Sequence, residues 1–326
     1  MSRRFSVCNG DADGLCSAVQ WFMHEPGPVM LVTGLKRERA LLGRVTAERG
    51  DEVNVFDLAL SPNRAALQRL LEAGVRVRYF DHHAMAGDLP KGALFETRMD
   101  MSSDACTSLL VDHRIGGACH GWALVGTYGD NLVAMGDRLA AEWGFGPADR
   151  ERLHRLGANI NYNAYGEDER DVRIAPAELY EVMSRYRDPR DMLSEERIVD
   201  EIDALRCDDL QRGLALAPYW ERPQGSVHLL PDAPWSGRVV GTLANALADA
   251  NPAGARAVLK PTRRGGYLAS VRAPLQAPQG ADALCRRFGG DGRAAAAGID
   301  ELPAGQLDRF IAAFADMRWG EPSAEA

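Results

Sequence analysis

The chain has 326 residues, of which 46% are hydrophobic and 26% charged, ordinary values for a globular protein of about two domains. Its net charge of −8 argues against a protein that coats nucleic acid, although residues 256–293 hold eight basic and two acidic residues and predict a local anion-binding patch. No apolar run approaches the ~18 residues that span a bilayer, and the first residues turn polar before a signal-peptide core could form. We therefore expect a cytoplasmic protein without membrane association.

Strands and helices alternate along the first quarter of the chain. Short aliphatic runs predict strands over 5–9, 28–34, 52–60 and 75–83. Helices are predicted from about Gly14, over 35–50 with Gly50 as its end, and after Ser61 as N-cap with Gly74 as its stop. This alternation is typical of an α/β fold with an N-terminal, doubly wound and mainly parallel sheet.

The remainder of the chain predicts a helical segment and then a second domain. Residues 104–216 are mostly helical in pattern, and the prolines and glycine of 217–225 predict a linker. Strands over 226–230, 255–261 and 266–273, with helices at about 236–250, 279–288 and 304–316, predict a smaller α/β domain. We thus expect one domain over 1–216 and a second over 226–320.

The stretch "NGDADGLC" (9–16) has oxygen-bearing side chains on alternate residues, like the start of an EF-hand calcium loop. The twelfth position counted from Asn9 is Gln20, however, whereas a calcium loop needs a bidentate Glu there. A predicted strand also stands where an EF-hand has a helix. Both observations argue against a calcium-binding module.

Acidic residues and histidines fall at the carboxyl ends of predicted strands or in a nearby helical region: Asp11, Asp13, Asp57, Asp81, His82, His83 and Asp130. In open parallel sheets, ligands bind at this edge. Two like charges ~4 Å apart repel by about 4 kcal/mol at an effective dielectric of ~20, so the set needs a cation. Carboxylates with imidazole suit manganese, magnesium, iron or zinc, and two such ions can direct water onto phosphorus.

This ordered set resembles the motifs of the DHH phosphoesterase superfamily, which includes RecJ-type exonucleases and nanoRNase-type oligoribonucleases. The stretches "NGDADGLCSA", "VFDLAL", "YFDHHA" and "GTYGDN" resemble motifs I to IV. The stretch "FGGDGRAAAAGI" (288–299) resembles the glycine-rich signature of the DHH-associated C-terminal domain. The resemblance implies a hydrolase of the phosphodiesterase or exonuclease type with two Mn²⁺ ions, Mg²⁺ or another divalent ion being the alternative.

The resemblance also implies residue roles. Asp11 would bind one metal ion and Asp13 the other, with Asp57 bridging them. His82 and Asp130 would complete the second site. The catalytic set would be His83 at the scissile phosphate with His82, and Asp81 orienting both histidines. Many relatives have histidine, and RecJ-type enzymes often aspartate, at the position of Asn9, which makes Asn9 a weak ligand.

Two stretches are candidates for substrate binding. Gly289, Gly290 and Gly292 let backbone N–H groups approach an anion before a helix expected from about Ala294, and Arg293 can grip a phosphate in bidentate fashion. A plain helix-entry turn is the alternative there. In "DACTSLLV" (104–111), Thr107 or Ser108 can contact substrate, or Asp104 simply caps a helix.

We predict a metal-dependent phosphoesterase that hydrolyses short oligonucleotides or nucleotide-derived diesters. Aromatic residues make up only 7%, which argues against a channel for long single strands, where bases stack on aromatic side chains. The alternative is a protein that keeps the fold and binds nucleotide or nucleic acid with weak or no catalysis. The sequence leaves the oligomeric state open, a homodimer being one option.

Overall fold

The computed structural model describes residues 2–85 and 87–321. The chain divides into two compact units, Met1–Asp203 and Ala204–Ala326, and the division falls within helix α9 (Arg197–Leu214). Segment 217–225, for which we expected a linker, instead contains strand β6 (Trp220–Arg222) and the first residue of β7 (Gly225–Leu229). Each unit is described separately below.

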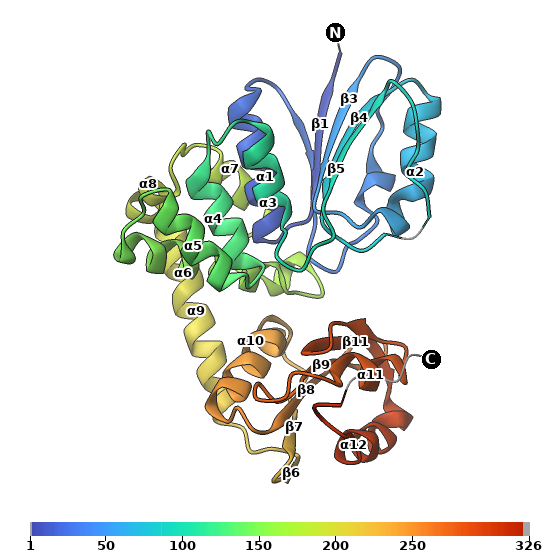
Figure 1. The fold of residues 1–326 in the computed structure, drawn as a ribbon, viewed down its shortest axis with the longest axis vertical. Coiled ribbons are helices and arrows are strands. Elements are labelled where there is room, and N and C mark those ends of the chain that lie inside the picture. The colour runs from blue at the N-terminus through green and yellow to red at the C-terminus, as the bar shows by residue number, and fades with distance from the viewer. Residues whose placement is uncertain (1, 86, 322–326) are drawn as a thin grey trace. The chain divides into compact units, whose positions relative to one another are not determined.

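The first unit is built on a parallel sheet of five strands in the order β2-β1-β3-β4-β5. They are β1 (Arg4–Cys8), β2 (Met30–Val32), β3 (Glu52–Phe56), β4 (Arg76–Asp81) and β5 (Phe95–Met99). Helix α2 (Leu60–Glu72) covers one face, and α1 (Ala12–His24), α3 (Thr107–Arg114) and α4 (His120–Gly129) cover the other (Figure 1). The predicted doubly wound parallel sheet is confirmed, with β5 as a strand that we did not expect.

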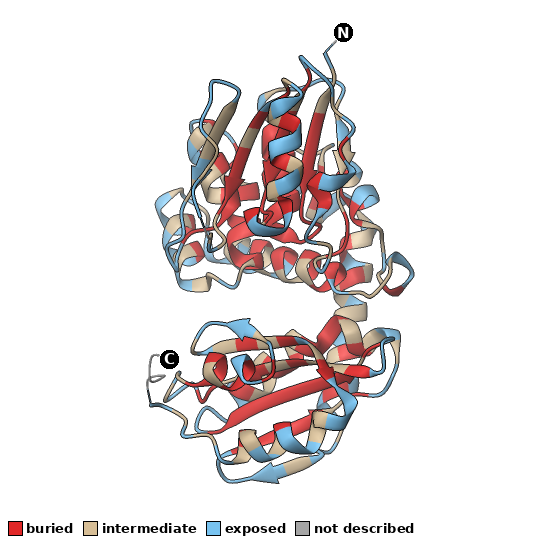
Figure 2. Ribbon diagram, turned by 90° about the vertical axis from the view of Figure 1, so that its right-hand side faces the viewer, coloured by how far each residue is buried: buried red, intermediate tan, exposed pale blue. Residues whose placement is uncertain are grey.

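Successive side chains of a strand point to opposite faces of the sheet, so each strand contributes to two hydrophobic cores, one on each face. Cys8 and Phe56 pack among α1, α4 and the later helices, whereas their neighbours Val7 and Val55 pack on the side of α2. All four are fully buried, and Figure 2 shows the strands buried along their central lengths. Burial on both faces explains why two successive apolar residues stand near the carboxyl end of β1, β3 and β4.

Helices complete the first unit, as predicted for residues 104–216. They are α5 (Val133–Glu142), α6 (Pro147–Ala164), α7 (Pro176–Met183), α8 (Pro189–Glu195) and the start of α9. Proline stands at the start of α6, α7 and α8, where its missing N–H costs no hydrogen bond. Across the described residues, we find no helix that combines the length and apolar character needed to cross a membrane.

The second unit has a six-stranded sheet in the order β10-β11-β9-β8-β7-β6. Its further strands are β8 (Ala255–Pro261), β9 (Gly266–Arg272), β10 (Asp291–Gly292) and β11 (Ala296–Pro303). Among these described strands, β7 and β8 pair in parallel and the other neighbours pair antiparallel. Its helices are α10 (Pro234–Ala250), α11 (Ala281–Arg286) and α12 (Leu307–Ala315). The three predicted strands and three predicted helices are confirmed, and β6, β10 and β11 are additional.

The helix predicted over 35–50 is wrong, because only a short 3-10 turn forms there, at Leu41–Arg44. Side chains of α2 take over the hydrogen bonds that a helix would have made. Asn63 donates to the carbonyl of Arg39 at 2.7 Å and accepts the N–H of Leu42 at 3.1 Å. The segment therefore stays irregular and runs along α2.

Two predicted helix caps also differ from the structure. Helix α2 begins at Leu60, so Ser61 lies inside it and Ala59 is the N-cap, while Gly74 follows its end at φ +81° as expected. Helix α3 begins at Thr107 with Cys106 as N-cap, so Asp104 does not cap it. The first turn of α3 is capped instead by a carboxylate from another part of the chain, as the next section shows.

Candidate metal centre

The loop between β1 and α1 places Asp11 and Asn9 at the carboxyl edge of the sheet. Asp11 is the N-cap of α1, and its Oδ1 accepts the N–H of Gly14 at 3.1 Å. A Cβ at Gly14 would lie 2.4 Å from the carbonyl oxygen of Asn9, so the loop requires glycine there. The amide oxygen of Asn9 accepts the N–H of Asp11 at 3.3 Å. The side chain of Asn9 thus folds back onto its own loop.

Asp13 lies in the first turn of α1 and is fully buried. Its two carboxylate oxygens accept the backbone N–H groups of Thr107 and Ser108, each at 2.7 Å. These N–H groups belong to the first turn of α3, where the helix dipole favours a negative charge. Thr107 and Ser108 are themselves fully buried, so the structure places them as supports of Asp13.

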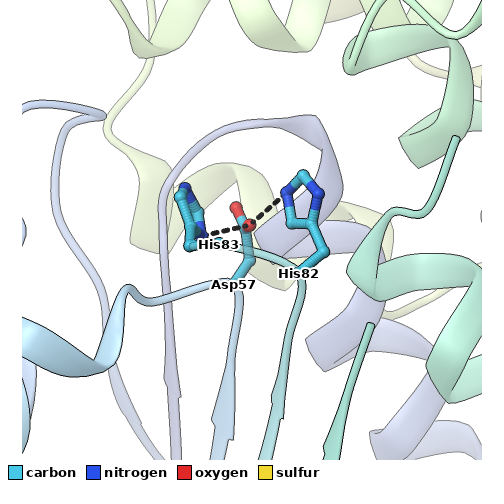
Figure 3. Close-up of side chains that lie close together, drawn as sticks. All are labelled: Asp57, His82 and His83. Atoms are coloured by element: carbon cyan, nitrogen blue, oxygen red, sulfur yellow. Dashed lines mark ion pairs between the residues drawn. The ribbon is translucent and has the colours of Figure 1, made fainter. Parts of the chain in front are cut away.

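Asp57 follows β3 and adopts φ +55°, a left-handed conformation that costs a non-glycine residue about 1 kcal/mol or more. Its N–H donates to the carbonyl of Phe80 at 3.0 Å, which fixes it beside the end of β4. The carboxylate is buried, and its Oδ1 has no hydrogen-bond partner. This oxygen lies 3.4 Å from Nε2 of His82 and 3.8 Å from Nδ1 of His83 (Figure 3).

The end of β4 supplies Asp81 and both histidines. Oδ1 of Asp81 lies 2.7 Å from Nδ1 of His83, and Asp81 is fully buried. Nε2 of His82 lies 3.2 Å from Oδ2 of Asp130 and 3.8 Å from Oδ2 of Asp13. Asp130 is the C-cap residue of α4, so the helical region contributes the last acidic group. The structure therefore brings together all seven acidic and histidine residues singled out in the sequence.

Two further residues contact this cluster without having been predicted. Nζ of Lys36 lies 2.6 Å from Oδ2 of Asp11. The side-chain amide of Asn161 accepts the N–H of Ala12 at 3.2 Å and donates to the carbonyl of Gly129, which ties the Asp11 loop to the Asp130 loop. The unusual density of asparagine in "NINYN" (159–163) was a signal for Asn161, whereas the local sequence held none for Lys36.

Burial and mutual repulsion shift the pKa values of the carboxyl groups. Burial, with the charges of Asp11 and Asp13, holds the pKa of Asp57 well above its usual range. Burial and the charge of Asp13 raise the pKa of Asp130 to about 7. At Asp11, burial is outweighed by the ammonium of Lys36, and its pKa is lowered. Without a cation, burial and repulsion therefore favour the protonated form of Asp57.

The donor atoms fit a divalent cation. Two sets of three residues place one ligand atom each within 4.8 Å of the others: Asp57, His82 and His83; and Asp13, His82 and Asp130. Carboxylate oxygen with imidazole nitrogen is a suitable ligand set for Mn²⁺ and related ions. The unpartnered Oδ1 of Asp57 is a buried acceptor for which a cation is the natural partner.

The glycine-rich stretch lies in the second unit and forms a tight turn. Gly289 adopts φ +77°, and a Cβ at Gly290 would lie 2.2 Å from the carbonyl oxygen of Gly298. Gly292 adopts φ +146° in β10, where it pairs with β11. Arg293 is exposed and closes the turn, its N–H donating to the carbonyl of Ala296 at 2.9 Å. The helix predicted from Ala294 is wrong, because this hairpin pairing continues into β11.

Comparisons with known proteins agree with this architecture. No protein-family model and no curated protein sequence matches the chain. Among solved structures, RecJ of Thermus thermophilus with Mn²⁺ has a TM-score of 0.60 at 21% identity, covering 96% of this chain and 51% of that one. The same RecJ is also known with Mg²⁺, at a TM-score of 0.54 and 18% identity over 96% of this chain and 48% of that one.

Two shorter proteins are similar along most of their length. A DHH-domain protein described as a member of a family of ribosomal proteins has a TM-score of 0.62 at 13% identity, covering 96% of this chain and 86% of that one. The pGpG-specific phosphodiesterase PggH of Vibrio cholerae has a TM-score of 0.54 at 15% identity, covering 97% and 100%. The chain spans about half the length of the Thermus RecJ. The predicted resemblance is confirmed at the level of the fold: the chain has the fold of the DHH superfamily.

Proposed function

We propose that the chain is a divalent-metal-dependent phosphodiesterase that hydrolyses short oligonucleotides or nucleotide-derived diesters. The observation that carries the proposal is the buried carboxylate of Asp57, whose Oδ1 has no hydrogen bond and faces both histidines. Burial and the neighbouring carboxylates raise the pKa of Asp57, and a bound cation stabilises such a group of carboxylates in its charged form. Asp13, Asp57, His82 and Asp130 would hold this ion.

A divalent ion at this position would lower the pKa of a bound water and neutralise charge on a phosphate oxygen. The chain's own residues prepare the site for it. The first turn of α3 fixes the carboxylate of Asp13, and Asp81 holds the ring of His83. His83 is part-exposed, so its other ring nitrogen can face a scissile phosphate as acid or as electrostatic stabiliser.

The substrate class is the finer part of the proposal. One structural neighbour is a phosphodiesterase specific for pGpG and others are RecJ, some with Mn²⁺ and one with Mg²⁺. We place Mn²⁺ first as the metal, with Mg²⁺ as the alternative. Arg293 and the glycines of its turn would bind a phosphate of the substrate away from the scissile bond. We place the activity in the cytoplasm, with no membrane partner and either a monomer or a homodimer as the active form.

A second candidate function is nucleotide or nucleic-acid binding with weak or no hydrolysis. Two observations favour it: the amide of Asn9 is turned to its own loop, and Asp11 is paired with Lys36. Both residues belong to the set expected to hold the first metal ion. The residues expected to hold the second metal ion, among them Asp13, His82 and Asp130, do lie together. For this reason we prefer hydrolysis over binding alone as the function.

The test is a panel of dinucleotides, short RNA and DNA oligomers, cyclic dinucleotides and nucleoside monophosphates, assayed with added Mn²⁺. Dialysis against a chelator should abolish hydrolysis, and Mn²⁺ should restore it better than Ca²⁺. Asp13→Asn should be inactive, whereas Asp88→Asn, which removes the same charge from an exposed position, should match the wild type. Full activity after verified metal removal would sink the metal-dependent mechanism. Tight binding of a panel member without hydrolysis would favour the second candidate.

A further inference from the structure

Lys36 holds a positive charge against Asp11 inside the carboxylate cluster. Its Nζ lies 2.6 Å from Oδ2 of Asp11, and the Asp11 side chain is only 3% exposed. The lysine is fixed from several directions: its N–H donates to the carbonyl of Ala164 at 3.1 Å, and its ammonium lies 5.5 Å from the centre of the Tyr165 ring. The ammonium is thus placed by the fold, and its side chain remains only 29% exposed.

This position follows from the irregular path of segment 35–50. In a helix, successive side chains of this segment would have pointed in different directions around the helix axis. The observed chain instead forms a tight turn at Leu35–Glu38. The N–H of Leu35 donates to the carboxylate of Glu38 at 2.9 Å, and the N–H of Glu38 donates to the carbonyl of Leu35 at 2.8 Å. This closed turn presents Lys36 toward Asp11.

Asp11 interacts with Asp57, but it is also engaged by other groups of the protein. Among the described residues, neither set of three that can hold a metal ion includes it. Its Oδ1 accepts the N–H of Gly14, its Oδ2 faces Lys36, and Asn9 is turned to the backbone. The two residues expected to define the first metal site are both already engaged.

We propose that Lys36 takes the place of the first metal ion, so that the chain works with one divalent ion, held by Asp13, Asp57, His82 and Asp130. This inference rests on the proposed phosphodiesterase function and replaces the expectation of two ions. A divalent ion at Asp11 would have to displace the part-buried ammonium of Lys36 from this carboxylate, and beyond a bridging Asp57 it would gain only the neutral Asn9 as ligand. A lysine can still stabilise negative charge on a phosphate in the transition state, as metal ions do.

Metal stoichiometry tests this directly. Mn²⁺ binding is counted by native mass spectrometry and calorimetry, and magnetic coupling between paired ions is read by electron paramagnetic resonance. The variants are Lys36→Met and the control Lys91→Met, which removes the same charge from an exposed position. The wild type and Lys91→Met should each bind one Mn²⁺ without coupling. Lys36→Met should bind two, with a coupled signal, and adding Asp11→Asn should return the count to one.

Two coupled ions in the wild type would overturn the inference while leaving the proposed function intact. One ion in Lys36→Met would overturn it as well, because the lysine would then not be what excludes the second ion. No bound Mn²⁺ in the wild type would instead defeat the proposed function itself. Circular dichroism checks the fold of each variant, and if Lys36→Met does not fold, the wild-type count alone decides.

Discussion

Asp81 and His83 form a hydrogen-bonded pair at the end of β4, with 2.7 Å between Oδ1 and Nδ1. Asp81 is fully buried, whereas the His83 side chain is 42% exposed. The Asp81 carboxylate therefore binds the buried side of the His83 ring. It fixes the tautomer of the ring and leaves Nε2 of His83 directed away from Asp81. Burial by itself lowers the pKa of His83, but the bond to Asp81 outweighs it and the pKa is raised.

Asp81→Asn should lower kcat/KM by about 10- to 100-fold, the range for residues that orient a catalytic or metal-binding side chain. Because the substitution removes the group that raises the pKa of His83, protonated His83 should be lost at lower pH. The alkaline limb of the pH–rate profile should then move to lower pH. His83→Gln should remove that limb altogether. An unshifted limb in Asp81→Asn would show that Asp81 has a purely structural role.

The second prediction compares Asp57→Asn with Asn9→Ala. Asp57 is the only carboxylate whose oxygen lies close to both histidines among the described residues, whereas Asn9 is neutral and turned to its own loop. Asp57→Asn should reduce kcat by on the order of 100-fold or more, at the upper end for disruption of a metal site. Asn9→Ala should cost much less. Equal and small losses in both variants would show that Asp57 is not a metal ligand.

The third prediction concerns the pH dependence of metal affinity. The pKa of Asp130 is raised to about 7 by burial and by Asp13. Below this pH the carboxyl group is protonated and must release its proton to bind an ion, so affinity should fall as the pH falls. For one displaced proton the loss is about tenfold per pH unit below ~7. The affinity for Mn²⁺ should thus rise from about pH 5.5, and the contribution of Asp130 to this rise should end near pH ~8.

Calorimetric titration with Mn²⁺ across this pH range measures the effect. Asp130→Asn cannot be protonated, so at the alkaline end of the range it should bind more weakly than the wild type but with a shallower pH dependence. Some dependence should remain, because the pKa of Asp57 is also raised. If the affinity of Asp130→Asn for Mn²⁺ depended on pH as steeply as that of the wild type, the proton released on metal binding would come from another group.

The sheet and the candidate metal ligands of the first unit were predictable because short stretches of sequence indicate both. Each central strand is marked by β-branched and aromatic residues, and Asp11, Asp57 and Asp81 follow or end these strands. Parallel strands then bring these residues to one edge of the sheet without any knowledge of tertiary contacts. Asp130 was only a candidate on the residues alone, and the resemblance gave it a role as ligand, since it lies at the end of a helix whose position no local pattern gives.

Lys36 could not be predicted because its position depends on contacts distant in sequence. Segment 35–50 has the periodicity of an amphipathic helix, but Asn63 of α2 takes its backbone hydrogen bonds. Likewise the apolar run after Arg293 has the composition of a helix, and pairing with β9 makes it a strand. In both places tertiary hydrogen bonds override the local preference.

The last prediction concerns Arg293, which is exposed at the turn that joins β10 to β11. Gly290 and Gly292 are required by the close packing of the hairpin, so they shape the turn, and Arg293 is the group that can bind an anion. If it binds a phosphate away from the scissile bond, Arg293→Ala should cost roughly 1.5–3 kcal/mol of binding, the range for a hydrogen bond to a charged group. That corresponds to about ten- to a hundredfold in kcat/KM.

Most of this loss should appear in KM, because a contact that is equal in the ground and transition states does not change kcat. Small synthetic diesters lack the distal phosphate, so Arg293→Ala should slow oligonucleotide cleavage and spare these diesters. Arg293→Lys should restore activity only in part, since lysine lacks the bidentate fork. The measurement is kcat/KM for both substrate types in the wild type and both variants. An equal drop on both substrates would place Arg293 at the reacting phosphate, and no drop on either would leave the turn with a structural role alone.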